Sequence, residues 1–154
     1  MIKRLLLSVL LGVAAFAVAA PVYYPPVTNP SGGTQKVLCS IRAANFNSTA
    51  DQACSIPATV SSWAPTAIWA TNCSVSMTTA LGGVYPSASK GGTPLVAATQ
   101  AYTALTAASI VLPLTLAANI ATTRYTASTV YLSLTLAQGG AATCDFYVVG
   151  VDLT

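Results

Sequence analysis

Residues 129–137 read "TVYLSLTLA", and this stretch decides the fold class. Apolar side chains occupy every second position and hydroxyl-bearing side chains lie between them: Val130, Leu132, Leu134 and Leu136 against Tyr131, Ser133 and Thr135. A spacing of two sends alternate side chains to opposite faces of a β-sheet. The stretch therefore predicts a half-buried strand with one face in the core.

The same spacing extends outward into four further stretches: "KVLCSIRAA" (36–44), "TAIWATNCSVSM" (66–77), "SIVLPLTLA" (109–117) and "CDFYVVGVDL" (144–153). In the second stretch the alternation places Trp69 in the core, on the same face as Cys73. In the third, Pro113 indicates an edge strand or a bulge, because proline cannot donate to a sheet ladder. The last is apolar on both faces after Asp145, which indicates a strand covered from two sides or paired with a partner molecule.

Segments rich in glycine or small polar residues separate these stretches and predict turns, at 45–51, 61–65, 81–83, 89–92, 117–124 and 137–142. The alanine-rich segment 96–109 is interpreted as strand-like, with a helix as the alternative. Seven or eight short antiparallel strands at this spacing predict an all-β protein. The expected architecture is a β-sandwich, of which the jelly roll is one form.

The N-terminus predicts export. A short basic region is followed by an apolar run that ends in small residues, which is the pattern of a signal peptide over residues 1–20. Residues 21–34 contain four prolines and two glycines and are expected to form an extended arm. Residues 35–154 are then the β-sandwich domain. We expect a secreted or periplasmic protein without a membrane anchor after cleavage.

The charge content is low. Charged residues make up 6% of the chain, against a usual value of about 25%. After signal removal the net charge is +1, from Lys36, Arg42, Lys90 and Arg124 against three aspartates. Nucleic-acid binding needs clustered basic side chains that displace counterions, so this partner is not expected. Weak mutual repulsion favours self-association or a protein partner.

The four cysteines are Cys39, Cys54, Cys73 and Cys144. An even number in an exported chain predicts two disulfides, although sequence alone leaves three pairings open. Cys39 could face Cys54 across a first hairpin, or Cys54 could face Cys73 across a second. Buried free thiols are the alternative. A zinc site is not expected, because the chain has no histidine and no Cys-x-x-Cys pair.

Acid–base chemistry has few candidates, since the chain contains no histidine and no glutamate. Asp145 and Asp152 are seven residues apart on one expected strand, roughly 23 Å, so they cannot face each other across a sugar. Asp51 lies in a predicted turn and is expected to bond to backbone there. In "SKGG" (89–92), Lys90 lacks the neighbours of a phosphate loop and is expected to sit in a turn. We expect a non-enzymatic protein with no cofactor.

Several aromatic side chains could offer flat faces to a sugar ring, chiefly Trp63, Tyr85, Tyr102 and Tyr125. The alternative is that these rings pack in the core, with the tyrosines bridging core and water.

Three segments carry a resemblance to known proteins: "ANFNSTADQ" (44–52), "GGVYPSASKGGTPLVAATQAYTALTAAS" (82–109) and "LTLAANIATTRYTASTVYLSLTLAQGGAATCDFYV" (114–148). The chain resembles a group of small, uncharacterised β-rich proteins of bacterial and prophage genomes, some of which lie near virion structural genes. The resemblance implies a structural or interaction role. The predicted signal peptide of this chain departs from the pattern of a virion protein. Two functions are therefore expected: a subunit of a particle or surface assembly, or a secreted carbohydrate-binding module.

Overall fold

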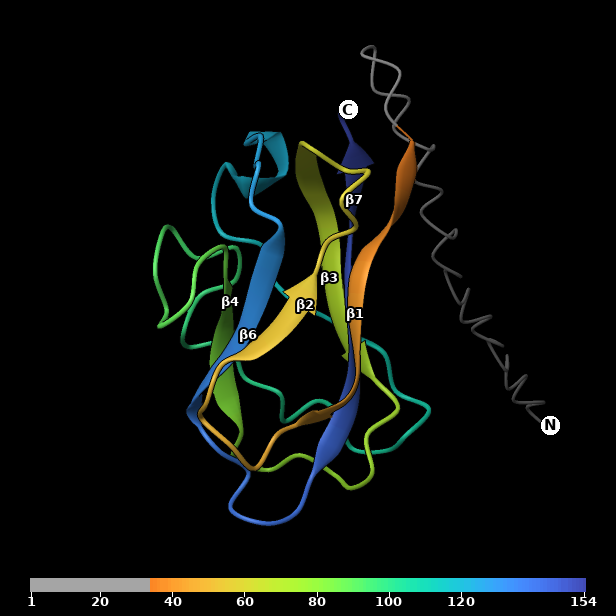
Figure 1. Ribbon diagram of the computed structural model, residues 1–154. Helices are drawn as coiled ribbons and strands as arrows, with labels where there is room; N and C mark the ends of the chain where they lie inside the picture. The colour runs from red at the N-terminus through yellow and green to blue at the C-terminus, as the bar shows by residue number, and fades with distance from the viewer. Residues whose placement is uncertain (1–33) are drawn as a thin grey trace, which may run out of the picture.

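The computed structural model describes residues 34–154, so the predicted signal peptide and residues 21–33 of the predicted arm lie outside the described part. The described chain is all-β, as predicted, with seven strands and one short 3₁₀ turn (Figure 1). In chain order these are β1 (Gln35–Asn45), β2 (Gln52–Ser55), β3 (Trp63–Thr71), β4 (Leu81–Tyr85), β5 (Leu112–Pro113), η1 (Ile120–Thr122), β6 (Thr129–Leu136) and β7 (Thr143–Asp152).

The strands form two antiparallel sheets, one of order β1-β7-β3-β5 and one of order β2-β6-β4. The pairs are nested, since β1 pairs with β7, β2 with β6 and β3 with β5. Residues 96–101 complete the nest through isolated bridges to β4, Val84 with Val96 and Leu81 with Ala101. This is the order of a jelly roll in which one strand has been reduced to bridges.

The core lies between the two sheets. From β6, Val130, Leu132 and Leu134 are fully buried, and they are part of one cluster with Phe146 and Val148 of β7. The strand predicted at 129–137 is thus confirmed, and it ends at Leu136, which is exposed. Figure 1 shows β4 and β6 in one layer and β3, β7 and β1 in the other.

Two predicted turns are wrong. Residues 81–83 lie in β4, and residues 63–65 of the predicted turn 61–65 begin β3. In β4 glycine provides close approach: a Cβ on Gly83 would lie 2.5 Å from the carbonyl oxygen of Val96. Segment 96–109 is neither strand nor helix but a looped segment with isolated bridges.

The position of Trp69 is also a correction. A register shift between Pro65 and Ala67 changes which alternate side chains of β3 point inward. Ile68 and Ala70 are fully buried, whereas Trp69 is half-buried on the other face. The edge position expected from Pro113 is confirmed, because β5 ends the four-stranded sheet. The strand itself is shorter than the predicted 109–117.

Candidate functional site

All four cysteines are in disulfides, as predicted. Cys39 pairs with Cys54, with Cα atoms 5.6 Å apart, and Cys73 pairs with Cys144. The hairpin expected for the first pair is wrong, because β1 and β2 belong to different sheets. This disulfide instead ties the two layers together. The second joins the loop after β3 to β7, across a sequence separation of 71 residues.

Three of the four predicted binding aromatics are buried: Trp63, Tyr85 and Tyr102. Trp63 stacks on Tyr125 at 5.0 Å between centroids, and its indole nitrogen donates to the carbonyl oxygen of Ala127 at 2.9 Å. Tyr102 meets the ring of Phe46 edge to face, and burial raises the pKa of its hydroxyl well above the usual range. Only Tyr125 is partly exposed. The burial of the other three is what core packing predicts.

The three aspartates each hold local structure. Asp145 accepts hydrogen bonds from the backbone nitrogen of Ala43, from Arg42 and from Asn72, and these bonds lower the pKa of its carboxyl. Asp152 accepts from Lys36 at 2.6 Å and from Thr154, which lowers its pKa to about 2. These carboxylates lie on one strand, and neither faces the other.

Asp51 lies against the loop that contains Lys90. Interaction with the Ser133 hydroxyl is the largest cause that lowers the pKa of Asp51. The backbone nitrogen of Ser89, which donates to the Asp51 carboxylate, and the charge of Lys90 lower it further. Ser89 and Lys90 both have positive φ, 56° and 57°, a conformation unusual for residues other than glycine. The loop at 89–92 does hold an anion, and that anion is the protein's own carboxylate.

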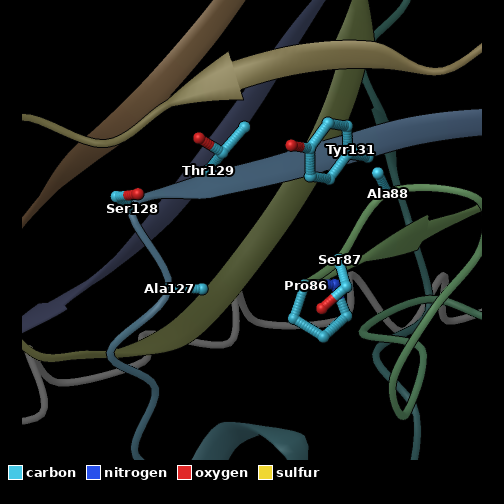
Figure 2. Close-up of a pocket in the computed structure, with 7 residues that line it drawn as sticks. All are labelled: Pro86, Ser87, Ala88, Ala127, Ser128, Thr129 and Tyr131. Atoms are coloured by element: carbon cyan, nitrogen blue, oxygen red, sulfur yellow. The ribbon is translucent and has the colours of Figure 1, made fainter.

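One shallow pocket of about 310 Å³ lies beside Tyr131 of β6 (Figure 2). Its walls come from the segment after β4 and from the residues that lead into β6: Pro86, Ser87, Ala88, Ala127, Ser128, Thr129 and Tyr131. None of these side chains is charged. The combination of one aromatic ring with several hydroxyl groups suits a small neutral polar ligand.

A second surface is the solvent side of the four-stranded sheet, which we call the outer face. Cross-strand register places Val37, Val149 and Ala67 in one row, and Ser40, Tyr147, Trp69 and Pro113 in the next. Both rows run across the sheet from β1 toward β5. The second sheet packs on the opposite side, so these side chains point away from the core.

Aromatic and apolar groups dominate the outer face. The rings of Trp69 and Tyr147 lie 6.1 Å apart and are tilted by 39°, and the guanidinium of Arg42 lies 4.9 Å from the centre of the Tyr147 ring. Val37 is 51% exposed. Trp, Tyr and Arg are the residue types enriched at protein interfaces.

Sequence reasoning did not find this surface, because it placed Trp69 in the core. One signal was available: residues 144–153 are apolar on both faces, which was interpreted as double coverage or a partner. In the structure β7 is a central strand with one face in the core and the other on the outer face.

No family model matches the chain, and no curated protein is significantly similar to it. Among residues 34–154 there is no group of three or more His, Cys, Asp or Glu side chains suited to a metal ion. Within the same range no helix is long and apolar enough to cross a bilayer.

Proposed function

We propose that this chain is an exported, non-enzymatic structural or interaction protein, a subunit of a particle or surface assembly that docks through the outer face. One observation carries the proposal. The central strand β7 is apolar on both sides, and its outward Tyr147 lies beside Trp69 on a face that also carries the exposed Val37, whereas Val149 on that face is only 6% exposed. An aromatic and valine-rich sheet face with an arginine has the composition of an interface core.

Two further features support export and a non-catalytic role. Two disulfides in a domain of this size are typical of proteins in oxidising compartments, outside the cell or in the periplasm. Every aspartate of the chain accepts hydrogen bonds that fix a strand or loop, so these carboxylates serve the fold. A general acid or base would need a partner group across a substrate, and the aspartates provide none.

The test is to fractionate a producing culture into periplasm, clarified supernatant and high-speed pellet, and to identify the chain in each by mass spectrometry. We expect recovery mainly in the pellet together with other assembly proteins. A Trp69→Thr variant should move to the soluble fractions. Recovery of the wild type only as a free soluble domain would contradict the proposal.

The pocket beside Tyr131 favours a second candidate, a carbohydrate-binding module. Sugars are recognised by aromatic rings and hydroxyl groups together, and this pocket offers both. Here the test is retention on a panel of immobilised polysaccharides. Binding that falls when Tyr131 is replaced by alanine, but not when Trp69 is replaced by threonine, would favour this function over assembly.

A further inference from the structure

We infer that the outer face is covered by a second copy of this chain, packed face to face in a two-fold symmetric dimer. The inference rests on the proposed function, because it names the partner for the same surface. Isologous contacts, in which one patch meets its own copy, are the commonest arrangement in soluble homo-oligomers. Two sheets can stack in this way at about 10 Å, with their strands about 30° from parallel.

The apolar groups lie at the centre of the outer face. Trp69 and Tyr147 sit on β3 and β7, the two inner strands of the four-stranded sheet. Interface residues with large energetic effects cluster at the centre of a contact and are often Trp or Tyr. Val37 lies on the same face of β1 and is 51% exposed. The apolar part of the outer face therefore extends from β1 to β3.

The charge of the outer face also suits a second copy of the chain. The charged side chains that register and contact place on the outer face are Arg42 and Asp145, which form an ion pair at 2.8 Å. The surface is thus neutral overall and meets its own copy without an unmatched charge. The described domain carries four basic and three acidic side chains, a net charge of +1, so two copies repel each other only weakly. A strongly basic or acidic partner would meet no surface of opposite charge on the outer face.

The size of the outer face reaches the minimum for a dimer. Its strands β1, β7, β3 and β5 have 11, 10, 9 and 2 residues. At about 3.3 Å per residue and about 4.8 Å between strands, they cover roughly 500 Å² per copy. Two such faces would bury about 1,000 Å², which is the lower limit for a specific interface.

The edge of the sheet is a poorer site for a second copy. Strand β1 is an edge strand, but two register irregularities interrupt its pairing with β7. The backbone nitrogens of Ala43 and Asn45 are already bonded to the side chains of Asp145 and Gln52. Bulges and occupied amides protect edges from strand addition. Strand addition at β1 is therefore less favourable than contact through the outer face.

The test is sedimentation velocity with light scattering on the exported, oxidised chain, over a dilution series between about 1 and 100 µM, a range that reports micromolar affinities. We expect a dimer for the wild type. Val37→Lys places a charge in the interface and Trp69→Thr removes its central ring, so each should raise the dimer dissociation constant about tenfold or more. Val75→Lys is the matched control, because Val75 is 43% exposed and lies in the loop after β3. It should leave the dimer unchanged.

Circular dichroism and melting curves confirm that each variant is folded. A wild type that stays monomeric at 100 µM, or a dimer that is indifferent to both face variants, would overturn the second-copy inference. Chemical cross-linking in the producing culture separates this failure from that of the proposed function. A cross-link to a different protein that disappears in Val37→Lys would show that the outer face is an interface, but that its partner is not a second copy. The absence of both dimer and cross-link would reject the interface itself.

Discussion

At the scale of single residues, Asp145 shows how a chain with few charges uses them. The residue is only 7% exposed, and its carboxylate accepts from Ala43, Arg42 and Asn72 at 2.8 to 3.1 Å. Its bonds hold together the irregular end of β1, the start of β7 and the end of β3. A buried carboxylate with this many donors stabilises by closing a network rather than by attraction to one cation.

We therefore expect Asp145→Ala to lower the free energy of unfolding by about 2 kcal/mol, because three hydrogen bonds to a buried carboxylate are lost together. Arg42→Ala is the control and should cost much less stability, since the Arg42 side chain is 68% exposed and water screens its ion pair. Urea unfolding of both variants measures the difference. Equal losses would show that the ion pair, and not the network, is what matters.

The aspartates also set the response to pH. The pKa values of Asp51, Asp145 and Asp152 are all lowered by hydrogen bonds in the fold, that of Asp152 to about 2. A carboxyl group with a lowered pKa in the folded state contributes its full stabilisation at pH values above its unfolded pKa of about 3.9. This contribution is lost as the pH falls through the pKa of the folded state. Melting temperatures should be nearly level from pH 5 to 8, as no histidine is present. They should drop between about pH 4 and 2. A large change in melting temperature near pH 6 would contradict this account.

At the scale of elements, glycine decides how closely the strands approach. Gly150 lies in β7 between β1 and β3, and an added Cβ would collide with the carbonyl oxygen of Ala64 and come within 2.7 Å of the Leu38 side chain. Gly150→Ala should destabilise the domain by about 2 kcal/mol or more, because backbone atoms must move. Gly140→Ala is the matched control with nothing within 4 Å, and it should change stability by less than about 0.5 kcal/mol. Thermal unfolding compares the two, and similar melting temperatures would refute the argument.

Period-two alternation was enough to predict the fold class and the strands that run straight. Residues 129–136 alternate without interruption and form β6 as expected. The errors occur where a local signal has two physical meanings. Glycines at 82 and 83 were interpreted as a turn, whereas Gly83 allows residues 96–98 to lie against β4 and Gly82 allows the close approach of β6. Glycine composition alone does not separate a tight turn from a close approach.

The candidate site was harder to predict than the fold, for a related reason. One extra residue between Pro65 and Ala67 reverses the faces of β3, so Trp63 becomes core and Trp69 becomes surface. A bulge leaves little trace in an alternating sequence, and a shift of one residue exchanges the two faces of a strand. The disulfide pairing was open for the same kind of reason, because it depends on which sheet receives β2.

At the scale of the whole molecule, one disulfide joins the two sheets and the other joins the loop after β3 to β7. In the chain-entropy description a closed loop of 15 residues contributes about 3 kcal/mol and one of 71 residues somewhat over 4 kcal/mol. Replacing Cys73 and Cys144 by alanine should therefore destabilise more, by about 1 kcal/mol, than replacing Cys39 and Cys54, whose separation is 15. Urea unfolding of the two double variants gives the order, and the reverse order would show that the tie between the sheets matters more than loop length.

The central claim is that the outer face of the β1-β7-β3-β5 sheet is covered by a protein partner. Site-specific photo-cross-linking in a producing culture tests it most directly, with a photoreactive amino acid at position 37 on that face and, in a separate variant, at position 75 away from it. The account predicts a strong cross-linked product from position 37 and little or none from position 75. A protein that forms no product from position 37, or forms one equally from both positions, would contradict it.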